Sequence, residues 1–179
     1  SAASDVYKRQ EQMIVELGHF CLVLAFVLSV SQFVFPIFAS NSNFKQLHLI
    51  TLRMSLLNAI CVLLSFMSLV WAFIVSDFSV ALVAEHSHSS KPMIYKISGT
   101  WGNHEGSLLM WILILSIFGA GLALTQKTMP ISQKSLILGI QGSIGSAFLA
   151  FCLFTSNPFE RLSNIPLNGN GLNLSLIHI

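Results

Sequence analysis

Apolar residues fill four long stretches of the chain that contain no Asp, Glu, Lys or Arg. These stretches run over residues 17–44, 54–76, 106–126 and 135–159. Each is longer than the roughly 20 residues that a helix needs to cross a hydrocarbon core. A backbone in lipid must satisfy its polar groups within its own segment, so we expect helices. The predicted membrane spans lie near residues 14–38, 53–76, 107–126 and 135–155.

A fifth uncharged stretch follows Arg161, but it does not have the pattern of a span. It contains Pro166, Gly169, Gly171 and several asparagines. These residues favour turns over helices, so the stretch is predicted to be a loop.

Composition points to the same class of protein. Hydrophobic residues make up 54% of the chain and charged residues 9%, whereas a soluble domain carries about 25% charged residues. These values exclude a soluble globular enzyme, a disordered tail and a disulfide scaffold. The net charge of +2 is too small for a nucleic-acid-binding surface. We predict an all-α polytopic membrane protein: four transmembrane helices with a long outer loop, residues 77–106, between spans two and three.

The two ends of the chain differ from the rest. Residues 1–12 are small, polar and charged, and they precede the first methionine, Met13. We expect residues 1–12 and 174–179 to be non-native tails, which leaves 13–173 as the transmembrane part. The first apolar run is too long for a signal peptide and has no small-residue cleavage site after it, so we expect it to remain as a span.

The charges beside the spans predict an orientation. One side is flanked by four basic residues and no acidic ones: Lys45, Arg53, Lys127 and Lys134. The other side carries three basic residues and several acidic ones: Lys91, Lys96, Arg161, Glu16, Asp77, Glu85, Glu105 and Glu160. Because the positive-inside rule counts Lys and Arg, the loop over 77–106 is expected to face outward.

Small residues gather on the last two spans. They are Ser116, Gly119, Ala120, Gly121 and Ala123 in span three, and Gly139, Gly142, Ser143, Gly145, Ser146 and Ala150 in span four. Small residues four positions apart let helix backbones approach closely in lipid, so we expect these two spans to pack together. A sliding or ligand-lined seam is the functional alternative. Asn58 and Gln141 are expected to form hydrogen bonds between helices.

Single cysteines and histidines offer few sets of ligands. The cysteines lie separately in apolar runs, without a CxxC or CxxCH motif: Cys21, Cys61 and Cys152. They are expected to be small buried side chains. His19, near the outer end of span one, is either an axial haem ligand or an interfacial side chain. The Glu85-His86-x-His88 pattern suits the start of a zinc site, but the spacing fixes no further ligand. We assign no catalytic residue and no metal ligand.

The most specific segment is YKISGTWGNHEGSLLMW, at the end of the outer loop. Its candidates for a functional loop are Trp101, Gly102, Asn103, His104, Glu105 and Gly106. Asn103 suits the N-cap of the following helix, and Glu105 suits the positive end of its dipole. Trp101 and Tyr95 suit the water–lipid interface. The segment is either a well-capped re-entry into the membrane or a surface that faces a cofactor or partner.

Several segments, in the same order, resemble the CcmF family of cytochrome c maturation proteins, which includes NrfE. They are DFSVALVAEHSHSSKPMIYKISGTWGNHEGSLLMW, FTSNPFERL and IPLNGNGLN. The resemblance extends over essentially all of residues 13–173. It therefore covers the four predicted spans, the outer loop and the loop after the last span.

The resemblance implies a bacterial inner-membrane haem lyase component, with the 77–106 loop in the periplasm. It implies haem delivery from the haem chaperone CcmE, CcmH-type partners, and attachment of haem to apocytochrome c. It also implies a b-type haem between transmembrane histidines, and a tryptophan-rich WWD loop. This chain has no WWD run, and no histidine in it matches a family haem ligand. We expect the haem ligands to lie outside this chain, and we expect no catalysis by this chain alone. A structural docking subunit, or a transporter-type bundle with a His104–Glu105 proton relay, are the alternatives.

Overall fold

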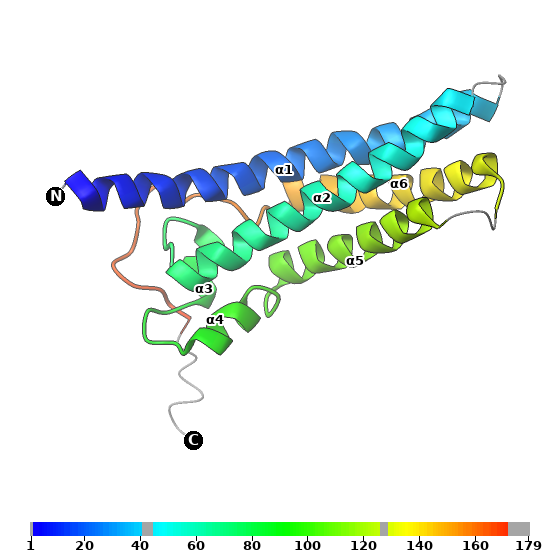
Figure 1. The fold of residues 1–179 in the computed structure, drawn as a ribbon. Coiled ribbons are helices and arrows are strands. Elements are labelled where there is room, and N and C mark those ends of the chain that lie inside the picture. Colours follow the sequence, from blue (N-terminus) through cyan, green and yellow to red (C-terminus); the bar gives the residue numbers. More distant parts are fainter. Residues whose placement is uncertain (1, 41–44, 126–128, 172–179) are drawn as a thin grey trace.

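Four long helices run side by side in the computed structural model, which describes residues 2–40, 45–125 and 129–171 (Figure 1). They are α1 (Ala2–Ser40), α2 (Lys45–Val75), α5 (His104–Leu124) and α6 (Ile131–Phe154). Two short helices, α3 (Ala81–His86) and α4 (Met93–Gly99), connect α2 to α5 at one end of the bundle. We call this end, formed by residues 77–106 and 156–171, the loop end.

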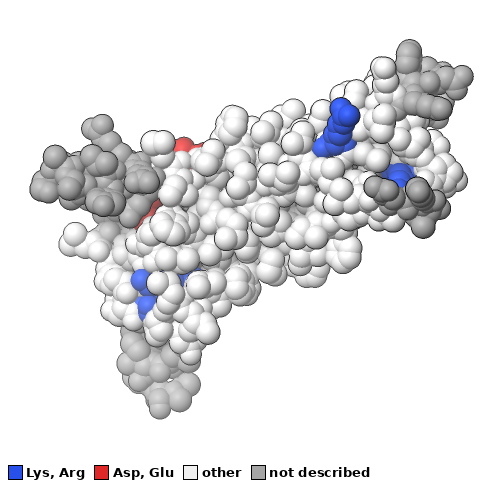
Figure 2. Space-filling model, viewed as in Figure 1, with Lys and Arg blue, Asp and Glu red and all other residues white. Residues whose placement is uncertain are grey.

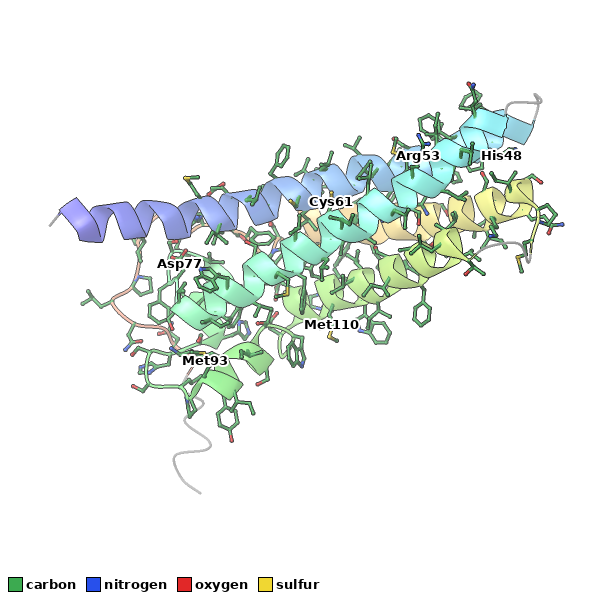
Figure 3. All side chains as sticks on the ribbon, in the orientation of Figure 1. His48, Arg53, Cys61, Asp77, Met93 and Met110 are labelled. Carbon is green, nitrogen blue, oxygen red and sulfur yellow. The ribbon has the colours of Figure 1, made fainter. Side chains whose placement is uncertain are left out.

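All four long helices are long and apolar enough to cross a membrane. The candidate spans are Met13–Phe38, Gln46–Val75, His104–Leu124 and Ile131–Phe154. On the face shown in Figure 2, a broad middle band carries no charged side chain. Figure 3 places Arg53 and Asp77 toward opposite ends of α2. The prediction of an all-α membrane protein with four spans is confirmed.

All four long helices begin earlier than the spans predicted from the sequence, and α1 begins at Ala2 rather than near 14. α2 begins at Lys45 rather than near 53, α5 at His104 rather than near 107, and α6 at Ile131 rather than near 135. A charged residue limits how deeply a segment lies in lipid, but it does not end a helix. The charge-free stretches therefore underestimated the lengths of the helices. The predicted tail 174–179 and the predicted end of span three at residue 126 lie outside the described residues.

The start of α6 illustrates how a charge is accommodated within a helix. Pro130 is its N-cap residue, and proline suits this position because the N–H it lacks would have no partner within the helix. Lys134 lies in the first turn, is 5% exposed, and donates from Nζ to the backbone oxygen of Thr125. Its charge thus stays at the end of the bundle opposite the loop end.

The core is mainly apolar toward the loop end, where Ser65 and Ser68 are also buried, and more polar toward the other end. Fully buried apolar side chains from all four helices form the first part: Leu22, Leu69, Phe73, Leu109 and Leu149. Buried polar side chains form the second part: Ser29, Gln32, Thr51, Ser55, Asn58, Ser116 and Ser135. Large apolar side chains also cover the outside of the helices, as the lipid-facing surface of a membrane bundle requires: Phe20, Phe118, Ile140 and Phe154.

The small residues of α6 pack mainly against α1, which differs from the prediction. A Cβ atom added at Gly142 would lie 2.9 Å from the backbone oxygen of Ser29, and one at Gly139 would lie 3.0 Å from Pro36. The predicted contact of spans three and four also exists, since Gly119 of α5 accommodates the side chain of Gln141. Small residues were thus a correct sign of close packing, but they do not specify which helix is approached.

The predicted interhelical hydrogen bonds both involve α5. Asn58 donates from Nδ2 to Oγ of Ser116 over 3.4 Å. Gln141 donates from Nε2 to the backbone oxygen of Leu115. Asn58 and Gln141 therefore bind neighbouring positions of the same helix.

Candidate functional site

Asn103 connects α4 to α5 at the loop end. Its Oδ1 accepts a hydrogen bond from the N–H of Gly106 over 2.6 Å, which is the N-cap interaction predicted from the sequence. Its Nδ2 donates to the backbone oxygen of Gly99 over 2.8 Å. The side chain is 8% exposed. One buried amide therefore bonds to the end of one helix and to the start of the next.

Gly106 is required because the backbone of the preceding loop passes very close to it. A Cβ atom at this position would lie 1.6 Å from the backbone oxygen of Thr100, a distance at which two atoms overlap. Gly102 is less confined, since its nearest neighbour would be 3.4 Å away. Among the described glycines none has a positive φ. Gly106 thus serves a close approach of backbone rather than a special turn conformation.

Trp101, His104 and Glu105 are the members of the predicted loop whose side chains reach the surface. Trp101 is 39% exposed, and His104 is exposed in the first turn of α5. Glu105 is half-buried in the same turn, where the helix dipole favours a negative charge. The structure therefore divides the predicted set in two. Asn103 and Gly106 fix the backbone, whereas the side chains of Trp101 and His104 are exposed.

An apolar groove runs down the surface between α5 and α6 from His104. Its volume is about 720 Å³, and its lining is almost entirely apolar: His104, Leu108, Ser143, Ile144, Ala147, Phe148 and Phe151. The rings of His104 and Phe151 meet edge to face, with centroids 6.2 Å apart and an angle of 78° between their planes. The imidazole is thus positioned at the mouth of the groove.

Arg161 joins three segments at the loop end. It forms ion pairs with Glu16 of α1 over 3.2 Å and with Asp77, just after α2, over 3.4 Å. It also donates to Oγ of Ser79. A backbone hydrogen bond strengthens these contacts, since the N–H of Leu162 donates to the backbone oxygen of Ser79 over 2.9 Å. The segment after α6 is thereby held against the start of the outer loop.

Residues 168–171 hold the far side of the same loop. Asn168 accepts from the N–H of Ser89 and donates to its Oγ, over 3.1 and 2.9 Å. The N–H of Gly171 donates to the oxygen of Ser87 over 3.0 Å. A Cβ atom on Gly169 would lie 2.0 Å from that same oxygen. The predicted loop after span four is irregular, as expected, but it is closely packed onto the end of α3.

Three further histidines, His19, His86 and His88, contact neighbouring parts of the protein. His19 packs edge to face on the buried ring of Phe159, with centroids 6.1 Å apart. His86 places Nδ1 3.2 Å from the oxygen of Leu82, and His88 accepts from the N–H of Ser90 over 3.1 Å. Within residues 2–40, 45–125 and 129–171, no three His, Cys, Asp or Glu side chains gather as metal ligands. The zinc alternative for Glu85-His86-x-His88 therefore gains no support.

Two lysines connect the outer loop to itself and to α2. Lys91 donates from Nζ to the oxygen of His86 over 2.8 Å, and its burial lowers its pKa. Lys96 donates to Oγ of Ser76 over 2.7 Å. Ser76 has φ of 58° where α2 ends, at a position usually occupied by glycine. These contacts make the outer loop a packed structure with two short helices.

The sequence patterns did not predict the contacts of Arg161 or the packing of residues 168–171 against the outer loop. Asp77, Arg161 and Gly169 all lie in the segments that carry the family resemblance. Opposite charges at the outer boundary of the spans were the available signal. Their pairing, however, depends on a contact between residues 84 positions apart, which no local pattern specifies.

Comparisons with known proteins find clear relatives of this chain. No family model matches the chain. Over 161 residues, 90% of this chain, the sequence is 45% identical to "Cytochrome c-type biogenesis protein ccl1" of Rhodobacter capsulatus. Over 162 residues it is 36% identical to "Cytochrome c-type biogenesis protein CcmF" of Haemophilus influenzae. Over nearly its whole length the chain is similar to CcmF-type cytochrome c biogenesis proteins. It spans about a quarter of the length of these relatives.

A solved structure supports the fold of this CcmF-type chain. "Cytochrome c Heme Lyase CcmF" superposes with a TM-score of 0.75 over 84% of this chain and 25% of that one, at 23% sequence identity. At this identity the likeness concerns the fold. The four-helix arrangement is therefore that of one part of a larger membrane protein.

Proposed function

We propose that this chain is the four-helix part of a membrane haem lyase subunit that acts in the biogenesis of c-type cytochromes. The observation that carries the proposal is the 45% identity to a cytochrome c-type biogenesis protein over 90% of the chain. The likeness in fold to a CcmF haem lyase supports it. The activity belongs to the whole protein, and this part contributes a rigid loop end beside the site of haem transfer.

The role of the loop end follows from what packing does and does not require. Asn103 and Gly106 hold α4 and α5 together, whereas the exposed rings of Trp101 and His104 make few demands on the fold. Aromatic and imidazole side chains on a rigid surface suit recognition of a partner. We propose that they face an apocytochrome or a haem-carrying partner such as CcmE, with CcmH-type subunits nearby.

His19 and His48 do not form the pair that a b-type haem held between two spans requires. Such a haem needs two imidazoles on facing helices around one iron. His19 packs on Phe159 at the loop end, whereas His48 lies toward the opposite end of α2. They cannot both bind one iron. We therefore assign the haem ligands to other parts of the family's longer chains, and we route no step through His19.

The test replaces His104 with alanine in the intact, full-length protein. We expect the yield of covalently bound haem in cytochrome c to fall, with the amount of the variant in the membrane unchanged. Tyr95→Phe is the control, because Tyr95 is exposed on α4 outside the loop candidates. Normal cytochrome yield with His104→Ala and Trp101→Ala would show that the loop is only structural.

We also propose that the chain lies in a bacterial inner membrane with its loop end in the periplasm. The basic residues at the opposite end, Arg53 and Lys134, support this orientation. Cysteines introduced at Ser90 and at Met129 test it, because the three native cysteines are buried. A membrane-impermeant maleimide on spheroplasts should label Ser90→Cys and not Met129→Cys. The reverse pattern would overturn the orientation.

The transporter-type alternative finds less support in the geometry. A proton relay needs ionisable groups inside the spans, whereas His104 and Glu105 lie in the first turn of α5 at the end of the bundle. The docking-subunit alternative predicts that every surface substitution in the loop is silent, which the His104 experiment decides.

A further inference from the structure

Polar side chains from all four long helices meet at one level of the bundle. Ser29 donates to the oxygen of Gly142 over 3.0 Å, and Gln32 donates to the oxygen of Leu138 over 2.6 Å, which joins α1 to α6. On the other side, Asn58 of α2 and Gln141 of α6 bind the neighbouring positions 116 and 115 of α5. We call this set the polar layer: Ser29, Gln32, Ser55, Asn58, Ser116 and Gln141.

The polar layer lies deep within the predicted spans. Gln32 is six residues from the nearer end of its span, and Asn58 is twelve from the nearer end of its own. At a rise of about 1.5 Å per residue, Gln32 is roughly 9 Å inside its span. Gln32 is 1% exposed, Ser55 2% and Asn58 6%. The layer is therefore remote from the solvent at either end.

Two amide oxygens in the layer lack a hydrogen-bond donor. Oε1 of Gln32 and Oδ1 of Asn58 are buried, and neither accepts a hydrogen bond from any residue that the structure describes. Buried polar atoms are nearly always paired, with protein or with ordered water. In a bundle surrounded by lipid an unpaired acceptor is especially costly. Both oxygens therefore require a donor that the described helices do not provide.

We propose that the polar layer binds ordered water molecules, which donate to Oε1 of Gln32 and Oδ1 of Asn58. The hydroxyls of Ser29, Ser55 and Ser116 provide the further partners that a buried water needs. The layer contains no carboxylate, so a cation there would be uncompensated in a low-dielectric region. Neutral amide and hydroxyl oxygens therefore suit water rather than a metal ion.

This site is independent of the proposed function of the loop end. It lies between the α1–α6 pair, joined through Ser29 and Gln32, and the α2–α5 pair, joined through Asn58. The ligand-lined seam considered from the sequence concerned the small residues of spans three and four instead. Bound water would bridge these pairs where direct side-chain contacts leave acceptors unpaired. Cys152 of α6, toward the loop end, is fully buried and serves as an internal reference. Ser65, one turn from Cys61, is also buried with an unpaired Oγ, so the comparison with variants of the polar layer decides the test.

Radiolytic hydroxyl labelling with mass spectrometry tests the proposal on the full-length protein in nanodiscs. Hydroxyl radicals formed from bound water oxidise side chains beside it. Cys61 lies on α2 one turn from Asn58, and both positions are buried. We expect Cys61 to be oxidised more than Cys152, and its excess to be lost in Gln32→Leu with Asn58→Leu. Labelling of the exposed Met129 should be equal in both proteins.

Equal oxidation of Cys61 and Cys152, or an excess at Cys61 that survives both substitutions, would overturn the proposal. Should the double variant fail to fold, Asn58→Leu alone provides the same comparison, because it removes the oxygen nearest to Cys61 in sequence. A second measurement separates water from a cation. Replacing choline chloride with sodium chloride at equal ionic strength should leave the thermal midpoint unchanged, and a rise that depends on Asn58 would favour a sodium site instead.

Discussion

Replacing Asn103 with alanine should open the joint between α4 and α5. The substitution removes the N-cap bond to Gly106, worth about 1 kcal/mol. It also removes the bond from Nδ2 to the oxygen of Gly99, for which a net value of about 1 kcal/mol is typical. Both bonds are short and the side chain is buried, so the full loss of about 2 kcal/mol is expected. Population of the opened joint should rise roughly 30-fold.

Hydrogen exchange measured by mass spectrometry on the full-length protein in nanodiscs reports this opening directly. Peptides covering the first turn of α5 should exchange faster in Asn103→Ala, while the middle of α5 is unaffected. Asn103→Asp is the matched variant, since it retains an oxygen for the N–H of Gly106 and loses the donor to Gly99. Its effect should be about half as large. Unchanged exchange in Asn103→Ala would refute the reasoning that this side chain fixes the joint.

The remaining predictions concern close contacts and one ion-pair cluster. Gly106→Ala should lower the amount of folded protein in the membrane, because its Cβ would overlap backbone, whereas Gly102→Ala should be tolerated. Gly142→Leu should separate α1 from α6 and lower the thermal midpoint, whereas Gly121→Leu should not, since nothing lies within 4 Å of the added Cβ. Arg161→Gln should accelerate hydrogen exchange in the segment after α6 by a factor of a few, because partly exposed ion pairs each contribute about 1 kcal/mol or less. An unchanged exchange rate would show that the backbone hydrogen bonds alone hold this segment in place.

The sequence predicted the class of fold well because the constraint was strong. A helix in lipid needs a long charge-free segment, so four such segments predict four spans. Helix starts were predicted less well, because residues 45–52 and 131–134 are helical outside the charge-free runs. The cap at Asn103 was predictable because it depends on residues three positions apart. The helix that packs against the small residues of α6 was not predictable. A glycine indicates that another backbone comes close, but it does not indicate which helix that backbone belongs to.

The structure also changes which parts of the resemblance bear on function. Asn103 and Gly106 in the loop, and Gly169 beyond α6, are each explained by a close contact or a cap. A family would retain them for folding alone. Among the described residues, no side-chain hydrogen bond or ring contact accounts for Trp101, which is exposed, and the ring contact of His104 is with Phe151. We therefore expect any chemistry at the loop end to depend on these two rings. Substitutions there should separate cytochrome maturation from protein stability, which substitutions at the glycines cannot do.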